Sequence, residues 1–128
     1  MKKILILGGY GYTGRPLAKH LLAQTDVEII ISGRSLQKAN SFVNELHNSR
    51  ASTRQVDASN LNDLTQALQG VTICLVAAPT TQHAETVIRA CIAAHVDYLD
   101  VQLSSKKMIS LYAAEKEIQQ AGLCFITE

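Results

Sequence analysis

The chain has 128 residues, of which 47% are hydrophobic and 18% are charged, and its formal net charge at pH 7 is +1. This length suits one domain with one hydrophobic core. The near-neutral charge offers no basic surface for nucleic acid or an anionic membrane, so we expect neither as a partner. The opening MKKILILGG holds too few apolar residues for a signal peptide or a membrane span. We therefore expect a single cytoplasmic domain that spans residues 1–128.

The three cysteines, Cys74, Cys91 and Cys124, are widely spaced and form no CxxC pair. An odd number of separated cysteines fits neither a disulfide framework nor a zinc site. We expect all three to be buried thiols in a reducing compartment, and the sequence predicts no metal site.

Short apolar runs alternate with helix-like patterns along the whole chain. The continuous run at residues 3–8 is typical of a strand buried on both faces. Ser35 is placed to cap the second helix, and Gly70 and Gly122 to end later ones. The runs predict strands at residues 3–8, 27–32, 52–57, 71–78, 96–101 and 123–127. The stripes predict helices around residues 17–22, 39–46, 61–68, 87–92 and 108–118.

Strands that alternate with helices in this way predict right-handed βαβ units. The expected fold is therefore α/β and doubly wound, a Rossmann fold whose six-stranded parallel sheet has the order 3-2-1-4-5-6 and helices on both faces. In its last helix, the apolar stripe expected to face the core consists of Met108, Ile109, Tyr112 and Ile118.

A cluster of glycines lies between the first strand and the first helix, in LILGGYGYTGRP at residues 5–16. Its GxGxxG spacing, in this context, is the fingerprint of a dinucleotide-binding loop. We expect Gly9 to make the tight turn, Gly11 to let a pyrophosphate approach the main chain, and Gly14 to let helix and strand pack closely. The helix N-terminus attracts the phosphates. The predicted cofactor-binding residues here are Gly9, Tyr10, Gly11, Tyr12, Thr13 and Gly14.

The end of the second strand indicates which dinucleotide binds. An NAD site usually places Asp or Glu there, whereas this chain has SGRS at residues 32–35. Next to Gly33, the guanidinium of Arg34 could bind a 2′-phosphate and stack on adenine, and Ser35 and Lys38 could add donors. The sequence thus favours NADP(H) over NAD(H). The alternative is that Arg34 is a solvated surface charge, and a phosphate role for Arg15 also stays open.

Two further strand ends are predicted to line the crevice. Asp57 ends the third strand, where it either accepts a hydrogen bond from the adenine amino group or makes a turn or helix cap. Ala77, Ala78 and Pro79 end the fourth strand and either leave room for the nicotinamide ribose or make a tight turn. His83 follows near the nicotinamide end, where we interpret it as a residue that starts a helix.

Tyr112 and Lys116 form a YxxxK pair, the proton-donor motif of classical short-chain dehydrogenases. The serine that such enzymes need about a dozen residues earlier is missing, and Tyr112 is predicted to face the core. We therefore do not expect this pair to be catalytic, and the sequence names no catalytic residue.

Several segments together resemble the NADP-binding domain of saccharopine dehydrogenase-like oxidoreductases. These segments are ILILGGYGYTGRPLAKHL, ISGRS, VDASNLNDLTQAL, VAAP, VIRACIAAHVDYLDV and EIQQAGLCFI. The most specific are GRS after the second strand and RACIAAHVDYLD before and within the fifth. The chain departs from the family at His95, where relatives tend to have glycine. Because histidine tolerates the left-handed conformation, we expect His95 to cap a helix.

The resemblance implies the cofactor-binding, N-terminal part of a longer enzyme that acts on C–N bonds in amino-acid or polyamine metabolism. A separate domain, absent from this chain, would bind the small-molecule substrate, so residues 1–128 alone would be inactive. The alternative is a stand-alone, non-catalytic NADP-sensing module, since GGYGYTGR is also similar to atypical short-chain dehydrogenases. A homodimer stays open in either case.

Overall fold

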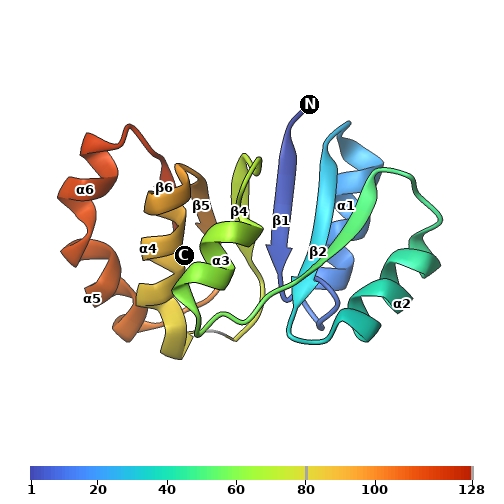
Figure 1. The fold of residues 1–128 in the computed structure, drawn as a ribbon, viewed down its shortest axis with the longest axis horizontal. Helices are drawn as coiled ribbons and strands as arrows, with labels where there is room; N and C mark the ends of the chain where they lie inside the picture. Colours follow the sequence, from blue (N-terminus) through green and yellow to red (C-terminus); the bar gives the residue numbers. More distant parts are fainter. Residues whose placement is uncertain (80, 128) are drawn as a thin grey trace.

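The computed structural model describes residues 1–79 and 81–127. Within this part of the chain, six parallel strands form one sheet in the order β3-β2-β1-β4-β5-β6 (Figure 1), which confirms the predicted topology. The strands are β1 (Lys3–Leu7), β2 (Glu28–Gly33), β3 (Ala51–Gln55), β4 (Ile73–Val76), β5 (Asp97–Asp100) and β6 (Phe125–Ile126).

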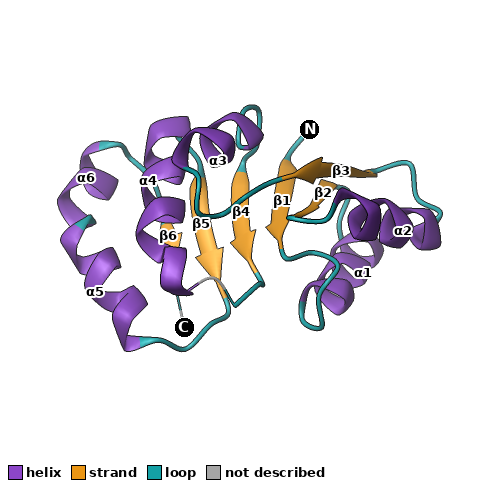
Figure 2. Cartoon of the chain, turned by 60° about the horizontal axis from the view of Figure 1, so that its bottom comes forward, coloured by secondary structure: helices purple, strands orange, loops and turns teal. Residues whose placement is uncertain are grey.

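Helices cover both faces of the sheet (Figure 2). The helices are α1 (Gly14–Gln24), α2 (Leu36–Leu46), α3 (Leu61–Ala67), α4 (Ala84–Ala94), α5 (Ser105–Ala113) and α6 (Glu115–Gln120), with a short 3-10 turn η1 (Thr81–His83) before α4. Residues of α1 and α2 share one buried cluster with the sheet, and residues of α3 to α6 share the other. None of the helices in the described residues is long and apolar enough to cross a membrane.

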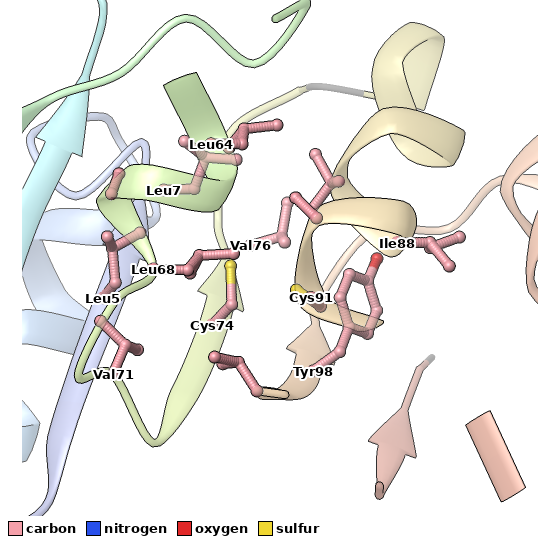
Figure 3. Packing of buried hydrophobic residues seen from close by; sticks show 14 of the residues in the cluster. Leu5, Leu7, Leu64, Leu68, Val71, Cys74, Val76, Ile88, Cys91 and Tyr98 are labelled. Atoms are coloured by element: carbon pink, nitrogen blue, oxygen red, sulfur yellow. The ribbon is translucent and has the colours of Figure 1, made fainter. Parts of the chain in front are cut away.

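The central strand explains why the first apolar run is uninterrupted. Leu5 and Leu7 of β1 face the cluster under α3 and α4 (Figure 3), whereas Ile4 and Ile6 face α1 and α2. A strand covered on both faces needs apolar residues at every position. At the edge of the sheet, β3 (Ala51–Gln55) has no fully buried residue, which accounts for its polar sequence.

The helix ends follow the sequence signals. Ser35 Oγ accepts a hydrogen bond from the Lys38 N–H at 3.2 Å and caps α2 as predicted. His95 ends α4 with φ of 61°, which confirms its expected left-handed cap. Gly70 and Gly122 also have positive φ, at +77° and +69°, so each ends its helix in a conformation that favours glycine.

The last predicted helix is in fact two helices, and of its predicted buried stripe Ile118 is buried and Met108 partly buried against the core, whereas the other two residues are exposed. Ala114, with φ of −96° and ψ of 0°, separates α5 from α6. Leu111, Ala114 and Ile118 face the core, whereas Ile109 and Tyr112 are 71% and 68% exposed. The buried positions Lys107, Leu111, Ala114 and Ile118 follow i, i+4, i+7, i+11 spacing, so one stripe faces the core, and the prediction missed it because the stripe begins with a lysine.

The cysteines differ from one another. Cys74 in β4 and Cys91 in α4 are buried as predicted, but Cys124 is exposed, contrary to prediction. Cys124 precedes β6, which has a neighbouring strand on one side only, so less of the protein covers it. A hydrogen bond with Cys74 and burial together hold the pKa of the Cys91 thiol well above its usual range.

Candidate functional site

A cavity of about 510 Å³ lies at the carboxyl ends of the strands. Its walls come from the loop after β1, the end of β2, the segment after β3 and the segment after β4. This is the point where the chain order reverses between β1 and β4, the usual position of ligands in doubly wound sheets. The predicted residues that line it are Tyr10, Gly11, Tyr12, Thr13, Gly33, Arg34, Asp57, Ala77, Ala78 and Pro79.

Four other predicted residues lie beside the cavity without lining it. Gly9 lies within the glycine loop and Gly14 is the first residue of α1. Ser35 caps α2, and Lys38 lies exposed on that helix. Their part in binding stays a prediction. Sequence analysis missed several lining residues at the same strand ends, namely Leu7, Gly8, Val56, Ala58, Ser59 and Gln82. Their only signal was position, since each lies within two residues of one that was predicted or discussed.

The glycine loop turns at Gly8 and Gly9. Gly8 has φ of +81°, and a Cβ there would lie 2.4 Å from the Cβ of Ala78. The Gly9 N–H donates to the Ile6 carbonyl at 3.1 Å, so Gly9 lies in the tight turn as predicted, although Gly8 is the residue with positive φ. A Cβ on Gly14 would lie 2.2 Å from the Gly8 carbonyl oxygen, consistent with the predicted close packing. A Cβ on Gly11 would meet one described atom within 4 Å, the Gly8 carbonyl oxygen at 3.2 Å.

The N-terminus of α1 lies directly behind this loop. Among the described residues, no side chain caps it at Thr13, and its first turn holds no acidic side chain. Such an end carries a partial positive charge and attracts anions. The side chain of Arg15 turns toward α2 instead, where its Nη1 lies 3.3 Å from Glu45 and its guanidinium lies over the Phe42 ring. Arg15 does not line the cavity.

Arg34 lies exposed at the end of β2 and lines the cavity. The peptide groups around it are fixed by three hydrogen bonds. The Arg34 carbonyl accepts from Gln55 Nε2 at 3.0 Å, and the Ser35 N–H donates to the Tyr10 hydroxyl at 3.0 Å. The Gly33 carbonyl accepts from the Val56 N–H at 2.9 Å. The charged side chain therefore extends from a well-held backbone.

Asp57 makes a turn, one of the two roles that the sequence left open, and its contact with adenine stays a prediction. Its Oδ1 accepts from the Ser59 N–H at 2.9 Å and from the Ser59 hydroxyl at 2.6 Å, so it makes a turn, while Asn60 caps α3. It also lines the cavity. The two bonds from Ser59, with smaller contributions from the charges of His83 and Arg34, lower the pKa of Asp57. The carboxylate therefore stays ionised and accepts hydrogen bonds at neutral pH.

The segment after β4 begins with residues that have small side chains. Ala78 lies against Gly8, since a Cβ on Gly8 would be 2.4 Å from the Ala78 Cβ, and Ala77, Ala78 and Pro79 all line the cavity. His83 begins α4, as predicted, and also lines this end of the cavity.

The comparisons with known proteins agree with this geometry. Residues 4–125 match the family model of the saccharopine dehydrogenase NADP-binding domain. The chain belongs to this family. The resemblance found in the sequence is thereby confirmed.

Individual relatives extend the likeness. The domain is 29% identical over 124 residues to the NADP(+), L-glutamate-forming saccharopine dehydrogenase of Schizosaccharomyces pombe, covering 97% of this chain and 26% of that protein. The structure of the apo L-Glu-forming enzyme from Saccharomyces cerevisiae has a TM-score of 0.84 at 21% identity, covering 100% of this chain and 27% of that one. Triphenylmethane reductase of Citrobacter sp., complexed with NADP(H), has a TM-score of 0.75 at 19% identity, covering 97% and 48%. The domain thus spans about a quarter of the two saccharopine dehydrogenases.

The YxxxK pair of the NADP-binding domain lies away from the cavity. Tyr112 is on α5 and Lys116 on α6, and neither lines the cavity. The expectation that Tyr112 faces the core was wrong, because its side chain is exposed. The pair still does not fit a catalytic role beside the dinucleotide, because neither residue lines the cavity.

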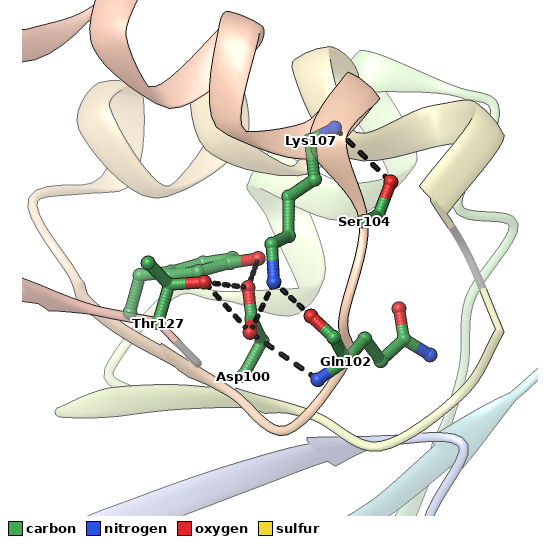
Figure 4. Close-up of polar contacts among 6 residues, drawn as sticks. Asp100, Gln102, Ser104, Lys107 and Thr127 are labelled. Carbon is green, nitrogen blue, oxygen red and sulfur yellow. Dashed lines mark hydrogen bonds and ion pairs between the residues drawn. The ribbon is translucent and has the colours of Figure 1, made fainter.

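Sequence analysis also missed a buried polar cluster beyond β5 (Figure 4). Lys107 Nζ lies 2.8 Å from Asp100 Oδ1 and also donates to the Gln102 carbonyl. Asp100 accepts further bonds from the hydroxyls of Tyr98 and Thr127. Burial opposes ionisation of Asp100, but the bonds from Lys107, Tyr98 and Thr127 together hold its pKa below the usual value.

Proposed function

We propose that this domain binds NADP(H) in the cavity, with the pyrophosphate on the glycine loop and the 2′-phosphate on Arg34. The observation that carries the proposal is that one cavity is lined by both Gly11 and Arg34. The end of β2 reads SGRS and contributes no carboxylate for a ribose 2′-hydroxyl. Membership of a family of NADP-binding domains supports the same cofactor.

The glycine loop suits the pyrophosphate for steric and electrostatic reasons. A Cβ on Gly11 would have only one described atom within 4 Å, so the space in front of Gly11 is open. Any side chain at this position would fill the space that we assign to the pyrophosphate. The N-terminus of α1 adds N–H groups and a partial positive charge. Phosphates therefore meet bare backbone and a favourable dipole at the same place.

Arg34 and Asp57 suit the adenosine half. An arginine forms charge-assisted, forked hydrogen bonds with phosphate, and its flat face stacks on a purine. Asp57 stays an ionised acceptor, as required to accept from the adenine amino group. The nicotinamide half then points toward Ala77, Ala78 and Pro79.

We infer further that the protein transfers hydride between NADP(H) and a C–N bond of an amino-acid or polyamine substrate. The support is the family and the saccharopine dehydrogenases to which the chain is similar. Because the chain spans about a quarter of those relatives, the substrate is expected to bind elsewhere in the protein. Residues 1–128 alone should bind the dinucleotide without steady turnover.

The test is to titrate NADPH and NADH into the wild-type chain and into Arg34→Ala by calorimetry in one buffer. A charge-assisted hydrogen bond is worth about 1.5–3 kcal/mol, so Arg34→Ala should weaken NADPH roughly ten- to hundredfold. NADH should lose only the stacking contribution, about a few-fold. Lys116→Ala, which removes an exposed charge on α6, is the matched control and should change neither. A wild-type preference for NADH would refute the assignment.

A further inference from the structure

The side chain of Tyr10 connects the two predicted phosphate sites. Tyr10 belongs to the glycine loop after β1, yet its hydroxyl accepts the Ser35 N–H at the end of β2, 3.0 Å away. Its ring lies directly over Gly33, because a Cβ on Gly33 would be 2.5 Å from the Tyr10 hydroxyl oxygen. The contact therefore requires both a tyrosine at position 10 and a glycine at position 33.

Tyr10 is itself held in place. Its carbonyl accepts from Arg15 Nε at 2.9 Å, and that guanidinium lies 4.7 Å above the Phe42 ring of α2. The Tyr10 ring also packs against the apolar cluster under α1 and α2. Ser35, at the other end of the contact, is the N-cap of α2. The glycine loop, Arg34 and the start of α2 thus form one connected unit.

Gln55 supports Arg34 from the opposite side. Gln55 ends β3 with an exposed side chain, and its amide donates to the Arg34 carbonyl at 3.0 Å. The peptide group after the Arg34 Cα is therefore held at its carbonyl by Gln55 of β3 and at its N–H by Tyr10 of the loop after β1. A charged group on a fixed backbone loses less freedom on binding than one on a mobile loop.

We propose that Tyr10 and Gln55 are positioning residues that set the preference for NADP(H) by holding the backbone of Arg34 for the 2′-phosphate. The inference rests on the proposed function. Neither residue needs to touch the 2′-phosphate, because each acts through Arg34. The Tyr10 contact also makes the geometry of the 2′-phosphate site depend on the glycine loop, so the two phosphate sites are coupled.

The test removes each contact and measures both cofactors by calorimetry on the full chain. Tyr10→Phe deletes the hydroxyl and keeps the ring, and Gln55→Ala deletes the amide. Each should weaken NADPH about three- to tenfold, the range of one hydrogen bond, and change NADH by less than about twofold. Tyr112→Phe and Gln37→Ala remove an exposed hydroxyl and an exposed amide outside the cavity and serve as matched controls.

The deciding measurement is the same change in an Arg34→Ala background. If Tyr10 acts through Arg34, Tyr10→Phe should then alter NADPH affinity by less than about twofold. An undiminished loss in that background, or equal losses for NADPH and NADH, would mean that Tyr10 contacts the shared part of the dinucleotide and would overturn the inference. So would unchanged affinity in both Tyr10→Phe and Gln55→Ala.

Two outcomes separate this inference from the proposed function. If Arg34→Ala itself leaves NADPH affinity unchanged, the assignment of the 2′-phosphate is wrong and the inference falls with it. If Arg34→Ala weakens NADPH but the positioning variants do not, only the inference is wrong. Circular dichroism checks folding, and Gln55→Ala, at an exposed edge position, keeps the test decisive if Tyr10→Phe does not fold.

Discussion

Replacing Asp100 by asparagine should strongly destabilise the domain, because it removes the buried carboxylate that pairs with Lys107 and accepts hydrogen bonds from Tyr98 and Thr127. The side chains of Asp100 and Lys107 lie 2.8 Å apart, and they are 0% and 2% exposed. Breaking such a pair from one side costs about 3–5 kcal/mol. For a chain of this length, that loss lowers the melting temperature by roughly 10–20 °C. The assay is urea and thermal unfolding at pH 7, followed by circular dichroism.

An exposed pair with the same chemistry provides the control. Arg89 and Glu117 lie 2.6 Å apart, but their side chains are 38% and 49% exposed. Glu117→Gln should therefore cost less than about 1 kcal/mol. The double variant Asp100→Asn/Lys107→Met removes both buried charges and should recover most of the stability lost in Asp100→Asn. If Asp100→Asn costs no more than Glu117→Gln, the cluster does not stabilise the fold as we argue.

The same pair predicts the direction of the acid response. The folded pKa of Asp100 lies below its unfolded value, so its contribution is complete above about pH 4. It is lost as the pH falls through the folded pKa, where the carboxylate takes up a proton. Asp100→Asn should therefore show a weaker loss of stability between pH 4 and pH 2 than the wild-type chain. An identical acid response in both would contradict the assignment.

Three other changes have distinct expected results. Gly11→Val should abolish dinucleotide binding by calorimetry while the melting temperature stays within about 5 °C, since its side chain enters the cavity and not the core. Gly14→Ala should instead destabilise the fold by about 1–3 kcal/mol in urea unfolding, because its Cβ would lie 2.2 Å from the Gly8 carbonyl oxygen. A thiol reagent should label Cys124 rapidly in the native chain and Cys91 only after unfolding, as mass spectrometry would show.

The parts of the fold that could be predicted are those governed by local sequence. The run KILIL is apolar at every position because β1 is covered on both faces, and it was recognisable for that reason. Ser35 and His95 act at helix ends through their own backbone and side-chain preferences. The glycine spacing located the turn, but it did not show that Gly8 is the residue with positive φ, because Gly8 and Gly9 are adjacent and glycine tolerates that conformation at either position.

The parts that could not be predicted depend on contacts between distant segments. A buried lysine such as Lys107 looks like a surface lysine in the sequence, and only its closeness to Asp100 explains its position. The contact of Tyr10 with Ser35 joins residues 25 positions apart, so a tyrosine in a glycine loop gives no sign of it. The same lysine concealed the buried stripe of α5 and α6, which consists of Lys107, Leu111, Ala114 and Ile118.

The position of the cavity follows from the connections between strands. From β1 the chain crosses by α1 to β2, and it enters β4 on the other side of β1 by way of α3, so neither connection covers the ends of β1 and β4. Small residues at both ends, Gly8 and Ala78, let the two loops lie in contact at the base of this opening. The topology thus fixes where a dinucleotide can bind. We propose that the choice of dinucleotide is made at the end of β2, where Tyr10 and Gln55 hold the backbone of Arg34. On this proposal, a change of cofactor preference needs changes in this peripheral group of residues and none in the central strands.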